Sequence, residues 1–473
     1  MRNLCQNLLA AAVLLLGAIP SFAQAQKREL PPPTANSAPA HGVIGVSDAQ
    51  LSADFWIAQL DQPDRVILSA DAIAAQNRKL FEVDSNMHDL HKQPKMLAKA
   101  DLTTAIKGLS SLPSSPLYDE QGNTVPATVL QPLVQALNLD AIAAEAPARY
   151  GMALKRTALR SFPTDLRVFS SKGSADIDRF QESALFPGTP VIAWHQSADG
   201  QWLWITSPNY QAWVRAEAIA FGTREAVFAH WAKTPYRIVT GAKLATVFTR
   251  EQPQLSELQL DMGLRVPLAN VPLDAPVNGQ HPYTSWAIEL PIRDAQGALA
   301  FAPALLQKNQ DSAADYLPLT RANLINQAFK FLGERYGWGH SYNGRDCSGF
   351  VSEVYRSMGV ELPRNTSAQR YSPGLTHTPF KDSDSAAARR AAVDKLEVGD
   401  LIYIPGHVMM MIGRIDGAPY VIHDTNGGSF LDANGNLRSM HLNAVSVTPL
   451  LPLRFNEKNS YVDRITSIVR IRP

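Results

Sequence analysis

One thiol and two imidazoles carry the clearest chemistry in this sequence. Cys347 stands in the run Asp346-Cys347-Ser348-Gly349-Phe350, and His407 and His423 follow it along the chain. A cysteine nucleophile needs a histidine within hydrogen-bond reach as its base, and a further polar group fixes the tautomer of that histidine. These residue types favour acyl transfer to a thiol followed by hydrolysis, a reaction that needs neither a metal nor a cofactor.

Cys347 is predicted to open a buried helix. Apolar residues recur after it at three- and four-residue spacing, and Gly359 ends their stripe: Phe350, Val351, Val354, Tyr355 and Met358. The free N–H groups and the dipole of a helix start stabilise a thiolate and can hold an oxyanion, so we expect a lowered thiol pKa. The alternative is an inert core cysteine, and the polar Asp346 and Ser348 on either side argue against it.

The base and its orienting group are predicted on neighbouring strands. His407 opens the strand 408–412 after a turn, and His423 ends the strand that follows, so the two rings are expected to lie side by side. Asp424 and Asn426 are rival orienting residues. A zinc site on the two histidines is another alternative, but it lacks carboxylates or further cysteines at a matching spacing.

Three other histidines are weaker candidates. His340 lies in the loop before Cys347, where it could touch a substrate, whereas His377 falls in a polar loop and His441 near the end of the chain. The stretch Lys381–Arg390 is predicted to be a solvated insertion.

Composition indicates the size and the compartment. The 473 residues are expected to form about three domains, and 44 basic against 43 acidic residues give no reason to expect a nucleic-acid partner. Residues 1–25 have a basic start, a short apolar run and a small-x-small end, so we expect a signal peptide. An exported protein of the periplasm or cell envelope, with no integral membrane segment, is predicted. Because Cys5 would leave with the signal, Cys347 would be the only thiol of the mature chain.

The segments that must position these residues change in character along the chain. Residues 26–43 are rich in Pro, Ala and Ser and predict a linker, and residues 44–150 predict a helical region. Short strands and tight turns then dominate two segments, 151–225 and 235–305. Residues 315–473 predict helices followed by antiparallel strands, which is an α+β order.

Together the motifs resemble the NlpC/p60 family of papain-like cysteine peptidases. The resemblance covers about residues 315–473 and rests on five segments: Tyr336-Gly337-Trp338-Gly339, Asp346-Cys347-Ser348-Gly349-Phe350, Gly399-Asp400-Leu401, Gly406-His407-Val408 and the strand that bears His423. It implies a papain-like catalytic domain with Cys347 as nucleophile, His407 as base and His423 as orienting residue.

The resemblance also implies substrate contacts for Tyr336, Trp338, Asp346 and Ser348, with Tyr336 a possible contributor on the oxyanion side. The sequence departs from the family at His340, where a second glycine is common, and in an added loop at about 375–395. Both departures bear on the shape of the substrate groove.

The preceding segments resemble the architecture of the same enzymes. Residues 151–225 and 235–305 resemble two small bacterial SH3-like β-barrels, and residues 44–150 resemble an N-terminal stabilising domain. In such proteins the first barrel can border the active groove, and the segment Asp176–Pro187 is then the candidate border. The alternative is that the barrels only support the fold.

Members of this family typically cleave the bond between D-glutamate and meso-diaminopimelate in peptidoglycan stem peptides. The expected function is therefore that of a cell-wall hydrolase, with peptidoglycan or its stem peptides as partner. Two alternatives stay open: an exported peptidoglycan-binding protein without turnover, and an amidase that cuts the sugar–peptide bond with the same thiol chemistry.

Overall fold

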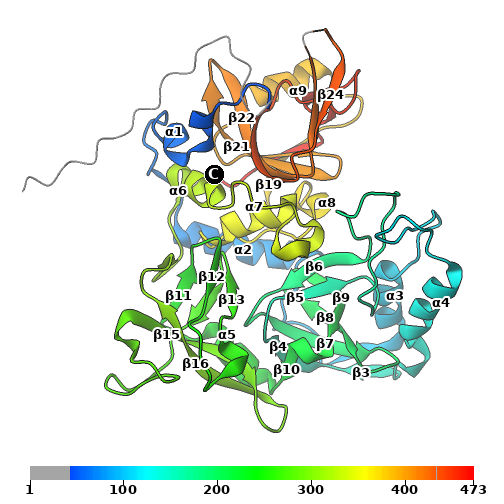
Figure 1. Cartoon of the computed structure of the whole chain (residues 1–473), viewed down its shortest axis with the longest axis vertical. Coiled ribbons are helices and arrows are strands. Elements are labelled where there is room, and N and C mark those ends of the chain that lie inside the picture. The colour runs from blue at the N-terminus through cyan, green and yellow to red at the C-terminus, as the bar shows by residue number, and fades with distance from the viewer. Residues whose placement is uncertain (1–42, 433, 473) are drawn as a thin grey trace, which may run out of the picture. The chain divides into compact units, whose positions relative to one another are not determined.

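The computed structural model describes residues 43–432 and 434–472 (Figure 1). The predicted signal peptide and nearly all of the predicted linker lie outside these described residues. Within them, no helix is both long enough and apolar enough to cross a lipid bilayer.

The C-terminal region is built on a six-stranded antiparallel sheet with the strand order β19-β26-β20-β21-β22-β25. Its strands are β19 (Thr376–Pro379), β20 (Leu401–Ile404), β21 (His407–Ile415), β22 (Ala418–Thr425), β25 (Ala444–Pro449) and β26 (Ser467–Arg470). Ile404 pairs with His407, so only Pro405 and Gly406 turn the chain between β20 and β21. Gly406 has a φ of +78°, a left-handed conformation that favours glycine. This tight hairpin fixes His407 at the mouth of its strand, as predicted.

Two helices pack on one face of this sheet, α6 (Arg321–Phe329) and α7 (Cys347–Arg356). The apolar stripe of α7, including Val351 and Val354, shares one core with Val408, Met410 and Ile422 of the sheet. The predicted amphipathic helix behind Cys347 is therefore confirmed, and its buried face holds it on the sheet.

The opposite face of the sheet is partly covered by the predicted added loop at about 375–395. Residues 375–395 contain the edge strand β19 and the helix α9 (Ala386–Val393), and Val393 and Arg389 are buried. The prediction of a solvated insertion at Lys381–Arg390 holds for most of its side chains, which are exposed. Arg389 is the exception, because it is buried and donates hydrogen bonds to the backbone carbonyls of Lys381 and Ile465.

The region predicted as the first barrel contains a seven-stranded antiparallel sheet with the order β10-β4-β7-β8-β9-β5-β6. Its strands are β4 (Arg149–Ala153), β5 (Thr157–Arg160), β6 (Gln181–Leu185), β7 (Pro190–Gln196), β8 (Trp202–Ser207), β9 (Tyr210–Arg215) and β10 (Ile219–Phe221). Trp204 and Trp213 pack edge to face in its core, 5.7 Å apart. The helix α5 (Arg224–Ala232) follows.

A second β region follows α5 and has a core of its own. Its strands are β11 (Tyr236–Val239), β12 (Lys243–Ala245), β13 (Gln259–Asp261), β14 (Arg265–Pro267), β15 (Ser285–Arg293), β16 (Leu299–Gln307) and β17 (Ser312–Ala313). That this region is a second SH3-like domain stays a prediction.

The helical N-terminal region divides its side chains between two cores. Trp56 of α1 (Ala53–Ile57) and Leu80 of α2 (Ala70–Val83) are buried in the core that contains α7. Leu102 and Ile106 of α3 (Lys99–Leu109) are buried in the core of the seven-stranded sheet, against which α4 (Ala127–Ala136) also packs. Figure 1 shows α2 beside α7, so this region braces the helix that carries Cys347.

Candidate active site

Cys347 is the first residue of α7, and its thiol lies at the helix start. Asp346 is the N-cap, and its carboxylate accepts a hydrogen bond from the Gly349 N–H at 2.8 Å. The backbone amides of Cys347 and Ser348 have no hydrogen-bond partner among the described residues. A helix start therefore supplies two free N–H donors beside the sulfur, which is the arrangement that can bind an oxyanion.

The thiol is nevertheless not activated in the resting site. Burial raises the pKa of Cys347 to about 12, and the negative charge of Asp346 adds to this, while a hydrogen bond with the Val408 backbone acts in the opposite direction. The expectation that the helix start would lower the thiol pKa was wrong, because desolvation and the carboxylate N-cap outweigh it. At neutral pH Cys347 is a neutral thiol and needs a base.

His407 and His423 are brought together as predicted. His407 Nε2 lies 2.8 Å from His423 Nδ1, and His423 Nε2 lies 3.0 Å from Thr448 Oγ1 of β25. Burial lowers the pKa of His407 to about 4 and holds the pKa of His423 well below its ordinary value. Both rings are therefore neutral at physiological pH, and His407 can accept a proton.

The thiol and the base meet through the first residues of β21. The Val408 backbone, next to His407, lies near enough to Cys347 to lower its pKa, and both residues belong to one core. Within the described residues no hydrogen bond joins the thiol to the imidazole, and Nδ1 of His407 is the ring nitrogen without a partner. Nδ1 is thus the nitrogen available to a proton from Cys347, since Nε2 is engaged with His423.

The rival orienting residues do not bond to His407. Asn426 donates instead to Asp176 at 3.3 Å, and both carboxyl oxygens of Asp424 are buried without a hydrogen-bond partner in the described chain. Burial and then the neighbouring Asp346 and Glu334 raise the pKa of Asp424 well above its ordinary value. No group of His, Cys, Asp and Glu side chains in the described part of the chain is arranged to hold a metal ion.

Sequence reasoning missed Arg364, a buried residue in the loop that follows α7. All five N–H groups of its guanidinium donate to protein acceptors, which are Asp346 (2.8 and 3.1 Å), Ser348 (3.0 Å), His340 (3.0 Å) and Ser183 of β6 (2.7 Å). One side chain therefore joins the nucleophile helix to the first barrel. An isolated arginine in a loop gives no sign of this in the sequence.

Asp346 and Ser348, predicted as substrate contacts, are engaged by Arg364. Burial alone would raise the pKa of Asp346, but Arg364 and the bond from Gly349 bring it down to about 2, so the carboxylate is ionised. A second oxygen of Asp346 accepts from the Gly339 N–H at 3.0 Å. These contacts hold the helix start in place, and a direct role toward substrate stays a prediction.

The Tyr336–Gly339 loop lies against the first barrel. Trp338 Nε1 donates to the carbonyl of Gln181 at 3.0 Å, and the Gln181 side chain donates to the carbonyl of Gly339 at 2.7 Å. Asp176 forms an ion pair with Arg335 at 2.7 Å. Tyr336 is buried, and burial raises its pKa well above the ordinary value. The candidate border segment Asp176–Pro187 thus touches the loop that leads to the nucleophile.

None of the hydrogen bonds that the other three candidate histidines, His340, His377 and His441, form within the described residues joins them to Cys347, His407 or His423. His340 is buried between Arg364 and Glu353, whose carboxylate lies 3.1 Å from its Nε2. His377 lies on β19 and bonds the carbonyl of Leu375, and His441 is exposed. The ring of His340 is part of the buried network around Arg364.

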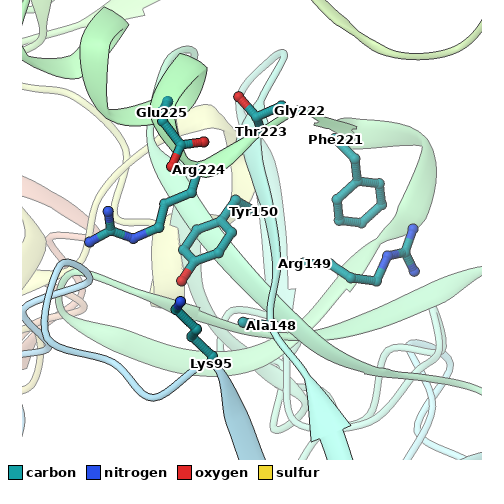
Figure 2. A pocket seen from close by; sticks show the side chains of 9 residues that line it. All are labelled: Lys95, Ala148, Arg149, Tyr150, Phe221, Gly222, Thr223, Arg224 and Glu225. Atoms are coloured by element: carbon teal, nitrogen blue, oxygen red, sulfur yellow. The ribbon is translucent and has the colours of Figure 1, made fainter.

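A surface pocket of about 480 Å³ lies on the barrel side, away from Cys347 and the histidine pair (Figure 2). It is lined by Lys95, Arg149, Tyr150, Arg224 and others, but the Arg149 guanidinium sits 3.9 Å from the Phe221 ring and Arg224 donates to the His91 carbonyl. Its arginines are therefore already occupied, and none of the predicted site residues belongs to it.

Two family models match the chain. The NlpC/P60 family model matches residues 333–447, the segment that carries Cys347, His407 and His423, and the SH3 domain (SH3b1 type) model matches residues 167–215. Residues 333–447 form an NlpC/P60 domain. The chain thus joins an NlpC/P60 domain to an SH3 domain in a mixed α and β structure, as the sequence predicted.

Curated relatives of the NlpC/P60 domain include named peptidases. The chain is 30% identical over 115 residues to dipeptidyl-peptidase 6 of Lysinibacillus sphaericus, which covers 24% of this chain and 36% of that protein. It is 34% identical over 125 residues to a gamma-D-glutamyl-L-lysine dipeptidyl-peptidase of Bacillus cereus, which covers 23% of this chain and 32% of that protein. The chain therefore spans about a third of the length of these relatives.

One solved structure shares most of the fold. It is an NlpC/P60 endopeptidase from Photobacterium damselae subsp. piscicida, with a TM-score of 0.69 and 15% sequence identity, and the match covers 88% of this chain and 96% of that one. At this identity the likeness extends to the fold, including the segments before the NlpC/P60 domain.

Proposed function

We propose that this protein is a cell-wall hydrolase that cleaves the D-glutamyl–meso-diaminopimelate bond of peptidoglycan stem peptides through Cys347, His407 and His423. The observation that carries the proposal is the bonded pair of neutral imidazoles beside a helix-start thiol, with His407 Nε2 2.8 Å from His423 Nδ1. The NlpC/P60 domain and the peptidase names of its relatives support the class of reaction.

The tautomers follow from the role of His407 as a base. Its unpartnered Nδ1 must be free of hydrogen to accept the thiol proton, so Nε2 carries the hydrogen and donates to His423 Nδ1. His423 must then carry its hydrogen on Nε2 and donate to Thr448 Oγ1 at 3.0 Å. The Thr448 hydroxyl, which can donate or accept, is compatible with this tautomer of His423 because it can accept from Nε2–H.

In the proposed reaction His407 takes the proton of Cys347 as the sulfur attacks the scissile carbonyl. The free amides of Cys347 and Ser348 bind the developing oxyanion, and the imidazolium then protonates the leaving amine. Water hydrolyses the resulting thioester, with His407 as base again. Because the thiol pKa is about 12, proton transfer in the encounter with substrate, rather than a preformed thiolate, starts the reaction.

The first barrel supports the choice of substrate in this proposal. Its strand β6 contacts the Trp338–Gly339 loop through Gln181 and the helix start through Ser183 and Arg364. The barrel therefore forms one side of the approach to Cys347 and restricts which stems reach it. Tyr336 and Trp338 are proposed to contact the stem, and export to the periplasm or cell envelope is part of the same proposal.

The test is digestion of purified sacculi and of free muropeptides, with the products identified by mass spectrometry. Wild type is expected to release products whose new amino terminus belongs to diaminopimelate, whereas Cys347→Ala releases none. A new amino terminus on the alanine next to the sugar would instead assign the amidase reaction. Equal, negligible turnover by wild type and Cys347→Ala would contradict the enzyme proposal and favour a wall-binding protein.

A further inference from the structure

A large cavity lies behind the nucleophile helix and is separate from the thiol. Its volume is about 860 Å³, and its walls come from α2, from the β6–β7 connection of the first barrel, from the loop at Gly263–Arg265 and from the far side of α7. Cys347, Tyr336, Trp338, His407 and His423 do not line it. Pockets of this size take small ligands when a few polar groups face a mainly apolar wall.

Two side chains of opposite charge, neither with an ion-pair partner among the described residues, face this cavity from the catalytic domain. The Glu361 carboxylate has no hydrogen bond in the described chain, and Arg356 donates from Nη2 to the Met262 carbonyl at 3.0 Å while its Nε is buried without a partner. Arg356 lies close enough to Glu361 to affect its ionisation, yet the two do not form an ion pair. Both residues are partly buried, and a ligand that carries both charges could pair with each of them at the cavity wall.

The backbone that presents Glu361 is held rigidly. Asn77 of α2 accepts a hydrogen bond from the Glu361 N–H at 3.0 Å and donates to the carbonyl of Gly359 at 2.7 Å. The Arg356 side chain packs on Gly263, where a Cβ would approach its Nε to 2.8 Å. The backbone at Glu361 and the Arg356 side chain are thus positioned before any ligand binds, which reduces the entropy lost on binding.

A second pair of free charges, Arg78 and Glu82, lines the cavity from α2. Both are exposed, and neither has a hydrogen bond or ion pair within the described part of the chain. Apolar and aromatic side chains complete the wall, among them Phe186 and the half-exposed Trp231. The cavity thus has two pairs of opposite charges in its wall, Arg356 with Glu361 and Arg78 with Glu82, together with apolar surface.

We infer that this cavity is a second binding site, for a small zwitterion that carries an amino-acid head at each end, such as free diaminopimelate or a short peptide containing it. One ammonium would bind Glu361 and its carboxylate Arg356, and the second head would bind Glu82 and Arg78, with the methylene chain on the apolar wall. The identity of the ligand rests on the proposed function, because hydrolysis of stems releases fragments of this chemistry. The existence of the binding site does not depend on the proposed function.

The cavity shares a wall with the Arg364 network. Arg364, His340, Gly349 and Glu353 line it, and Arg364 also holds the Asp346 N-cap of the nucleophile helix. A zwitterion bound there would lie against the side chains that fix the helix start. Its binding would therefore be coupled to the position of Cys347.

The experiment is equilibrium dialysis of labelled meso-diaminopimelate against the full chain after Cys347 has been blocked with iodoacetamide. Saturable binding of about one ligand per chain is expected, with pimelate and 1,5-diaminopentane competing at least tenfold less well because each lacks one charge of the head. Glu361→Gln and Arg356→Gln are each expected to weaken binding at least tenfold. Glu397→Gln, a surface change outside the cavity, is the matched control and should leave binding unchanged.

The exposed substitutions Arg78→Gln and Glu82→Gln keep the test valid if an interior variant does not fold, since neither side chain has a partner to lose. Each should weaken binding at least threefold. The proposal is overturned if the blocked chain does not bind the probe, if the four cavity variants bind it like wild type, or if only the unblocked chain binds it, which would place the ligand in the catalytic groove. Binding without turnover of sacculi would refute the proposed function and leave the cavity site intact.

Discussion

Arg364 and Asp346 form a buried two-point ion pair, with Nη2–Oδ2 and Nη1–Oδ1 distances of 2.8 and 3.1 Å, at the residue that caps the helix of Cys347. The same guanidinium reaches Ser183 of the first barrel at 2.7 Å. The nucleophile is therefore positioned from outside its own helix. The carboxylate that caps α7 also raises the pKa of the thiol beside it, so the structure combines a fixed geometry with an unreactive resting sulfur.

Removing the Arg364 guanidinium should destabilise the folded protein strongly, because it leaves the Asp346 charge buried and without its ion-pair partner. We predict that Arg364→Gln lowers the free energy of unfolding by about 3–5 kcal/mol. Urea unfolding followed by tryptophan fluorescence measures this. Arg390→Gln is the matched control, since its ion pair with Asp394 is exposed and should contribute less than about 1 kcal/mol. Equal effects of the two substitutions would contradict the role of Arg364.

The thiol should react slowly at neutral pH. Because burial and Asp346 raise its pKa to about 12, alkylation of Cys347 by iodoacetamide is expected to accelerate continuously as pH rises from 7 to 10, with no plateau at low pH. The measurement is the rate of mass increase in a Cys5→Ser background. The urea-unfolded chain is the control and should show the ordinary thiol profile near pH 8.5. A fast rate that is constant from pH 5 upward would indicate a preformed thiolate instead.

Loss of the base His407 should lower kcat/KM more than loss of its orienting partner His423. We predict that His407→Ala lowers kcat/KM on muropeptides about 10³-fold, and His423→Ala about 10²-fold. His423→Asn should retain more activity than His423→Ala, because its amide oxygen can still accept from His407 Nε2–H. Turnover is followed by chromatography of the products, and the exposed His441→Ala should leave it unchanged. Equal activity of the two His423 variants would exclude an orienting role for that ring.

Acid should begin to destabilise the protein near pH 6.5, which is above the pH range in which carboxylates ordinarily titrate. The folded-state pKa of His407 is about 4, below the unfolded value near 6.5, so between these limits the unfolded chain binds a proton that the folded chain does not. Stability is therefore complete above pH 6.5 and falls as pH drops toward 4, by at most about 3 kcal/mol from His407. His340 and His423, whose pKa values burial also lowers, change stability in the same direction.

The measurement is the free energy of unfolding in urea from pH 7 to pH 4. His407→Gln should flatten the curve by removing one of the buried titrating groups, whereas the exposed His441→Gln should follow wild type. A wild-type curve that is level down to pH 4.5 would contradict the buried neutral state of these histidines.

The sequence by itself determined the parts of the site that depend on local pattern. The apolar stripe after Cys347 predicts a helix because its spacing matches the helical repeat, and α7 begins at that residue. The strand and turn before His407, and the strand that carries His423, follow from β-rich runs separated by turn residues. These elements sufficed to name the three residues of the proposed triad.

Tertiary structure alone decided the electrostatics and the partners of the site. The thiol pKa is raised because the sheet and Asp346 surround the sulfur, and desolvation depends on neighbours distant in the chain. Thr448, Arg364 and Ser183 joined the site through contacts between segments that no spacing in the sequence connects. For the same reason the sequence does not reveal that Arg389 and Val393 are buried next to an otherwise exposed stretch: their burial depends on packing against distant segments, not on local composition.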